Sequence, residues 1–285
     1  MAQNLVNGLF MGGLYALTAS GLTLIFGVMR VINIAHGEFL MLGAYISFFL
    51  FDLYGIHPLF SLPIAMAILF ALGLITQRVL IHRVVGAPEL ASLLLCFGLS
   101  ILIVNLALYL FKADYRSIPV LSGSLPLWGL SLSEARLVAF LIALSLSVTM
   151  FAFLKFTRLG KAIRAVSQNR EAALTCNIDV RKIDMLAFGI GVGLVAASGA
   201  LFSFVQTIYP GMGGVYTLKS FFVIVLGGMG NFVGAFMGGL ILGLIEAVAT
   251  IGISPQAAEA LTYLLLIVIL LARPMGLLGV RTRKG

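Results

Sequence analysis

Long apolar segments separated by shorter polar intervals make up most of the chain. An apolar helix of about 20 residues crosses a hydrocarbon core of ~30 Å, because each residue rises about 1.5 Å. Helices are expected because a lipid-exposed backbone must satisfy its own hydrogen bonds, and the segments lack the alternation of barrel strands. The pattern therefore predicts an all-α, polytopic transmembrane helical bundle. Nine spans fit, within a range of eight to ten, at residues 5–27, 38–53, 59–81, 91–111, 136–156, 185–208, 211–229, 234–251 and 257–272.

The composition agrees with a membrane protein. Of the 285 residues, 61% are hydrophobic and 10% are charged, whereas a soluble domain carries roughly 25% charged residues. The net charge of +8 clusters at the ends of spans, so we do not predict a nucleic-acid partner. Two cysteines, Cys96 and Cys176, give no disulfide framework. Because the N-terminal residues lack the basic region of a signal peptide, we expect an uncleaved first span in a single domain, 1–285.

Two long polar intervals, 112–135 and 157–184, predict the orientation of the chain. Basic residues favour the cytosolic side of a membrane. The first interval holds only Lys112 and Arg116. The second holds six of the 18 basic residues: Arg158, Lys161, Arg164, Arg170, Arg181 and Lys182. We therefore place 157–184 and the C-terminal residues in the cytosol, and 112–135 and the N-terminus outside.

The second interval also predicts a short helix, Arg170 to Cys176. Asn169 is a good N-cap for it, and Glu171 places negative charge in the first turn. Asn177 follows where a helix end favours a left-handed residue. Two turns alone are marginal in water, so something must stabilise them. Either a partner protein holds this helix, or the interval lies as a basic loop against anionic headgroups of the membrane.

Glycines recur every four residues in the region 211–251. Gly230, Gly234 and Gly238 form one such row. Stacked small residues let helix backbones approach closely, which favours association in membranes. The row predicts tight packing within the chain, with a subunit interface as the alternative. The abundance of glycine also allows a broken or re-entrant helix in this region.

Four polar residues at membrane depth are candidates for a substrate pathway. Glu246 lies inside a predicted span, and Asn33, His36 and Glu38 lie at the start of another. Polar groups at this depth are costly and tend to mark pathways. The structural alternative is that Asn33 caps the second helix while Glu38 complements its dipole.

Motifs for enzymatic chemistry are absent from the sequence. It contains no Walker A or G-x-G-x-x-G pattern, and its three scattered histidines show no metal-ligand spacing. We therefore predict no catalytic residue, no metal site and no bound cofactor in this chain.

Four segments resemble the permease subunits of ABC importers for branched-chain amino acids, specifically the smaller of the two permeases. They read INIAHGEFLMLGAY (32–45), GKAIRAVSQNREAALTCNIDVRK (160–182), LKSFFVIVLGGMGNFVGAFMGGLILGLIEA (218–247) and RPMGLLG (273–279). The resemblance implies that 157–184 is a cytosolic coupling segment, with Arg170, Glu171, Ala172, Ala173 and Asn177 at its centre. Relatives carry an EAA pattern followed by glycine, and here Asn177 stands in place of that glycine.

The resemblance implies half of a pathway in the bacterial cytoplasmic membrane, with no enzymatic activity in this chain. The expected partners are a larger permease, two cytosolic ATPases that bind ATP and Mg²⁺, an extracytoplasmic binding protein and membrane lipid. The same architecture serves urea and short amides, which remain an alternative cargo. A second alternative is a stand-alone secondary amino acid carrier. A proton-coupled carrier needs titratable residues in several spans, and only Glu246 and the His36/Glu38 pair are identified here.

Overall fold

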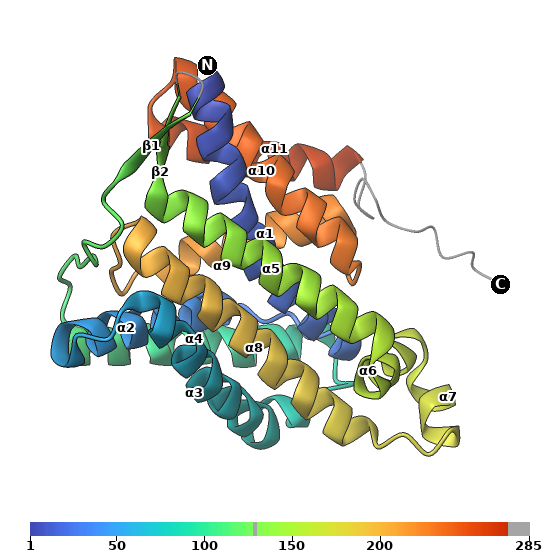
Figure 1. The fold of residues 1–285 in the computed structure, drawn as a ribbon. Coiled ribbons are helices and arrows are strands. Elements are labelled where there is room, and N and C mark those ends of the chain that lie inside the picture. Colours follow the sequence, from blue (N-terminus) through green and yellow to red (C-terminus); the bar gives the residue numbers. More distant parts are fainter. Residues whose placement is uncertain (128–129, 273–285) are drawn as a thin grey trace.

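The computed structural model describes residues 1–127 and 130–272, and helices dominate it (Figure 1). In chain order the elements are α1 (Ala2–Met29), α2 (His36–Tyr54), α3 (Pro58–Val79), η1 (Ile81–Arg83), α4 (Glu89–Phe111), β1 (Ser124–Leu127), β2 (Leu130–Ser133), α5 (Glu134–Phe156), α6 (Arg158–Gln168), α7 (Arg170–Thr175), α8 (Val180–Val205), α9 (Met212–Gly227), α10 (Phe232–Gly252) and α11 (Pro255–Ala272).

The helical bundle predicted from the sequence is confirmed. Each of the nine predicted spans coincides with a helix, and seven of these helices are long and apolar enough to cross a membrane. Helix α9 is a shorter apolar helix of 16 residues. The largest difference from a predicted boundary is at the start of α8, which begins at Val180, inside the interval 157–184, because the side chain of Asp179 accepts a hydrogen bond from the Lys182 N–H and caps the helix there.

Helices α1 and α8 form the centre of the bundle. In each, 83% of the most apolar window is buried, compared with 11% in α4. Helix α1 packs against α5, α8, α9 and α10, while α8 also packs against α2 and α3. Most large apolar side chains of α4 are exposed, for example Leu102 at 63%. Such a surface suits lipid or another membrane subunit rather than water.

Glycines allow α10 to approach α1 and α9 closely. A Cβ at Gly234 would overlap the Gly227 carbonyl of α9, and one at Gly238 would lie 2.7 Å from the Val223 oxygen. Gly230 differs from the sequence interpretation: it lies in the turn between α9 and α10 with φ of +80°, a conformation that glycine adopts without strain. Gly234 and Gly238 thus lie at contacts within the chain.

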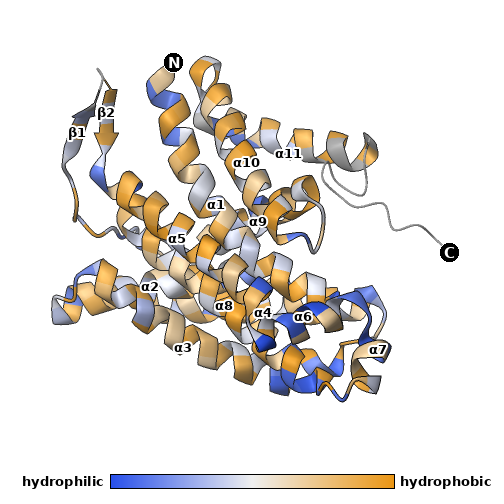
Figure 2. Ribbon diagram, turned by 45° about the vertical axis from the view of Figure 1, so that its right-hand side comes forward, coloured by the Kyte–Doolittle hydropathy of each residue, from blue (hydrophilic) through white to orange (hydrophobic). Residues whose placement is uncertain are grey.

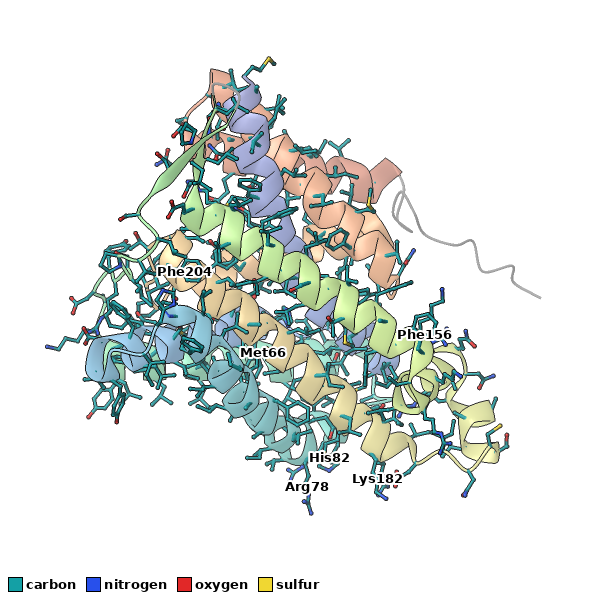
Figure 3. All side chains as sticks on the ribbon, in the orientation of Figure 1. Met66, Arg78, His82, Phe156, Lys182 and Phe204 are labelled. Carbon is teal, nitrogen blue, oxygen red and sulfur yellow. The ribbon has the colours of Figure 1, made fainter. Side chains whose placement is uncertain are left out.

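The two polar intervals lie at opposite ends of the molecule. Strands β1 and β2 form an antiparallel hairpin at one end, and α6 and α7 project from the other (Figure 1). We call these the hairpin end (residues 124–133) and the α6–α7 end (residues 158–175). Hydrophilic residues gather around the second end (Figure 2). Figure 3 places Arg78, His82 and Lys182 along the same lower edge of the molecule.

The hairpin was not predicted from the sequence. Its strands are four residues long each, with Ser124 opposite Ser133, and such short strands give little periodic signal. The N-terminus of α1 stabilises the edge of β2, because the Gln3 amide donates to the Ser131 carbonyl (2.7 Å) and accepts from the Ser131 N–H (2.9 Å). Trp128 and the C-terminal segment 273–285, including the RPMGLLG motif, lie outside the described residues.

Candidate functional site

A polar cavity of about 520 Å³ opens between α1, α9, α10 and α11 toward the hairpin end. This volume lies within the range of roughly 300–1,000 Å³ that small-molecule sites occupy. Charged and amide side chains line it: Asn4, Asn7, Arg136, Gln206, Lys219, Glu246 and Glu259. Of the four predicted pathway residues, Glu246 lines this cavity, whereas Asn33, His36 and Glu38 do not.

Glu246 is paired with a lysine that the sequence interpretation missed. The Nζ atom of Lys219 in α9 lies 2.9 Å from Oε1 of Glu246 in α10, and the side chains are 12% and 17% exposed. Tyr15 of α1 completes the group, since its hydroxyl donates to Glu246 Oε2 (2.8 Å) and accepts from Lys219 Nζ (3.1 Å). Three helices thus meet through one network, and both charges face protein or the cavity.

Aromatic rings surround the ammonium of Lys219. Its Nζ lies 4.7 Å from the ring centroid of Tyr15 and 5.9 Å from that of Tyr216. The hydroxyl of Tyr216 in turn donates to Gln206 Oε1 at 2.6 Å. Cation–π attraction is strongest where water is excluded, so these rings stabilise the charged form of the lysine in a largely apolar surrounding.

The signal for Lys219 was present in the sequence. It lies in the predicted span 211–229, where a lone lysine is costly unless it is paired. A search for an opposite charge at membrane depth would have returned Glu246. The pairing itself was not predictable, because 26 residues and a turn separate the two, and only the antiparallel arrangement of α9 and α10 brings them together.

The His36–Glu38 segment forms a buried junction between α1, α2, α4 and α9. His36 Nε2 lies 2.9 Å from the Thr18 carbonyl, and Ser100 donates to Glu38 Oε1 at 2.9 Å. The Gly37 N–H donates to Thr217 Oγ1 (2.8 Å). A Cβ at Gly37 would overlap the backbone of α9. This segment is therefore packed tightly between helices.

Asn33 does not cap α2, contrary to the structural alternative. The N-cap residue of α2 is Ala35, with no side-chain hydrogen bond, and the buried side-chain amide of Asn33 forms no hydrogen bond within the described residues. The backbone carbonyl of Asn33 instead accepts from the His36 N–H at 3.3 Å. Glu38 lies in the first turn of α2, as the sequence indicated.

The interval 157–184 folds into two helices, α6 and α7, and the start of α8. Asn169 caps α7 by accepting from the Ala172 N–H at 3.0 Å, and Asn177 has the left-handed φ of +59° that a helix end favours. Helix α6 precedes α7 and was not predicted as a separate helix. Beyond α7, a hydrogen bond from Lys182 lowers the pKa of the Asp179 carboxyl below its ordinary value.

Arg170, the first residue of α7, is tied to two long helices. Its guanidinium donates to both carboxylate oxygens of Asp184 in α8, at 3.0 and 2.7 Å, and to the Val28 carbonyl of α1 at 3.3 Å. The Asp184 side chain is 4% exposed. The Arg170 side chain is still 38% exposed, so its contact with a partner stays a prediction.

The exposed face of α7 consists of Glu171, Ala172, Leu174 and Thr175. Leu174 is 59% exposed, a large apolar side chain at a polar end of the molecule. Ala173, which we had placed in the same contact surface, is only 3% exposed. Only one side of a short helix faces the bundle, and Ala173 lies on that side, so it packs inward and holds α7 on the bundle.

Comparison with known proteins agrees with these features. Residues 4–270 match the family described as "Branched-chain amino acid transport system / permease component". The chain is 33% identical to the "High-affinity branched-chain amino acid transport system permease protein BraD" of Pseudomonas aeruginosa, over 97% of this chain and 95% of that protein. It is 31% identical to LivH of Salmonella typhimurium and 30% identical to LivH of Escherichia coli K12, with the same coverage.

No solved structure matches the chain significantly. The family match spans all the helices from α1 to α10 and nearly all of α11, and the apolar helices identify a multi-pass membrane protein. The chain therefore belongs to the family of permease components of branched-chain amino acid transport systems.

Proposed function

We propose that this chain is the smaller permease of an ABC importer and forms half of a pathway for branched-chain amino acids. The α6–α7 end is the observation that carries the proposal. There a short capped helix presents an exposed apolar side chain, Leu174, and is fastened through Arg170 to α1 and α8. A segment built to transmit force needs both an exposed contact surface and a firm attachment to the bundle.

ATP is hydrolysed by separate subunits in this proposal. The sequence has no phosphate-binding motif. Two cytosolic ATPases therefore bind ATP and Mg²⁺, one against each permease, and a larger second permease completes the pathway. A binding protein outside the membrane delivers the amino acid to the hairpin end. Membrane lipid covers the apolar surface of α4.

The Arg170 contacts give the coupling a physical route. A bidentate arginine–carboxylate pair fixes geometry as well as distance. If the ATPases close on ATP and displace α7, the pair transmits that displacement to the second turn of α8, and the bond to Val28 transmits it to the end of α1. These are the two helices at the centre of the bundle.

The orientation follows from the charge distribution. The basic interval and the ends of α3 and α8 lie at one end (Figure 3), and we place this end, with the C-terminus, in the cytosol. The hairpin and the N-terminus then lie outside, in the cytoplasmic membrane of a bacterial cell. The cavity opens on the outer side.

Reconstitution of the importer tests the proposed function. Proteoliposomes that contain both permeases and both ATPases, with the binding protein added outside, should accumulate L-leucine only when hydrolysable ATP is present inside. Urea and acetamide serve as competing cargoes. Uptake of urea in preference to leucine would replace the proposed substrate, and uptake without ATP or ATPases would favour a secondary carrier.

A further inference from the structure

Two opposite charges, close together, form the inner wall of the cavity described above. Lys219 and Glu246 are the only oppositely charged pair within 4 Å in the cavity lining, among the described residues. An amino acid carries an ammonium and a carboxylate on one carbon. We infer that Lys219 and Glu246 bind the zwitterionic head of the transported amino acid, a site that rests on the proposed function.

Both side chains retain capacity for a ligand. An ammonium has three N–H donors, and Lys219 uses one for Tyr15 while a second faces Glu246. Oε1 of Glu246 is buried against the ammonium and has no hydrogen bond of good geometry, so it becomes available to a ligand when the substrate carboxylate draws the ammonium away. The substrate carboxylate would bind Lys219, and the substrate ammonium would bind Glu246.

Small and apolar residues among the polar ones leave room for an aliphatic side chain beside this polar head. Gly8, Gly243, Ala247 and Ala258 line it with small residues, and Met11 adds a flexible apolar surface. A branched aliphatic chain can lie against these walls while the head stays at the ion pair. Urea has no separated charges, so the pair gives it no comparable contact.

A purely structural ion pair is the rival explanation, and it makes a different prediction. Replacing a buried ion pair by uncharged residues of similar volume often leaves stability unchanged. The double variant Lys219→Met/Glu246→Gln removes both charges and leaves neither unpaired. A structural pair would therefore let this double variant bind and transport like the wild type, whereas a ligand site would not.

Ligand binding should be measured on the assembled importer in nanodiscs without the binding protein, which would impose its own selectivity. Saturation-transfer NMR can compare L-leucine with leucinol, which lacks the carboxylate, and 4-methylpentanoate, which lacks the amine. In the wild type, each analogue should bind about tenfold more weakly than leucine, the loss expected for one charge-assisted contact. In Lys219→Met, leucine and leucinol should bind with equal affinity. In Glu246→Gln, leucine and 4-methylpentanoate should bind with equal affinity.

The double variant should lose detectable leucine binding while it still melts as a folded complex. Lys182→Met, at the opposite end of the molecule and 74% exposed, is the matched control and should bind normally. Wild-type binding by the double variant, or persistent discrimination against leucinol in Lys219→Met, would overturn the inference. Absence of ATP-driven leucine uptake by the wild type would instead refute the proposed function, so the two failures are distinguishable.

Discussion

At the scale of single residues, the energetics of Lys219 depend on three neighbours: Glu246 of α10, Tyr15 of α1 and Tyr216 of its own helix, α9. Removing its charge leaves Glu246 with only the Tyr15 hydroxyl, and removing Glu246 leaves an ammonium among aromatic rings. Breaking a buried pair from one side costs about 3–5 kcal/mol, whereas replacing both partners costs far less. Because both side chains are partly exposed to the cavity, we expect the cost of breaking the pair to lie at the lower end of that range.

The first prediction follows directly. Lys219→Met and Glu246→Gln should each lower the melting temperature of the purified permease, and the double variant should lie closer to the wild type than either single variant. Thermal unfolding in detergent measures this, with Lys182→Met as the control. Single variants that melt like the wild type would show that the pair is not stabilised by mutual contact.

At the scale of elements, α7 is a six-residue helix whose stability comes from its surroundings. Isolated helices this short do not persist in water. The Asn169 cap, the burial of Ala173 and the bonds of Arg170 hold it in place. Its outward side chains are thereby presented to a partner in one fixed orientation.

Leu174→Glu should prevent the ATPases from binding. A charge at the centre of a contact costs about 2–5 kcal/mol when it is buried without a partner. Co-purification with tagged permease measures the outcome: the second permease should be retained and the ATPases lost. Leu125→Glu changes an exposed leucine at the hairpin end and is the matched control. ATPases retained by Leu174→Glu would refute docking at α7 and would favour contact with headgroups.

Arg170→Gln should weaken the coupling of ATP hydrolysis to leucine uptake while the importer stays assembled. The variant keeps the outer face of α7 but leaves the Asp184 carboxylate, 4% exposed, without its bidentate partner. We expect ATPases to bind and hydrolyse ATP, with fewer leucine molecules imported per ATP. The ratio of uptake to phosphate release measures this, and an unchanged ratio would show that the displacement travels by another route.

At the scale of the whole molecule, the proposed orientation of the chain across the membrane can be tested with a natural cysteine. Cys176 at the end of α7 is exposed, whereas Cys96 is buried. An impermeant maleimide should label Cys176 in inside-out vesicles and not in intact cells. A Ser122→Cys/Cys176→Ser variant should give the opposite result, since Ser122 precedes the hairpin. Labelling of Cys176 from outside would invert the proposed orientation.

The sequence predicts the helices well and the site poorly, for physical reasons. Apolar length alone locates spans, and the Asn169 and Asn177 signals are local, so α7 was identified closely. The Lys219–Glu246 pair and the burial of Ala173 depend on how helices pack, which no local pattern encodes. The hairpin has strands of four residues, which carry too little periodicity to be detected. Gly230 fits the four-residue spacing of the glycine row, but it lies in the turn between α9 and α10.

The central claim is that ATP hydrolysis at the α6–α7 end drives an amino acid through this chain. Leucine uptake and phosphate release, measured together in the same proteoliposomes, test it most directly. The wild type should show both, Leu174→Glu should show neither, and Lys219→Met/Glu246→Gln should release phosphate without importing leucine. ATP-dependent uptake by Leu174→Glu at the wild-type rate would contradict the account.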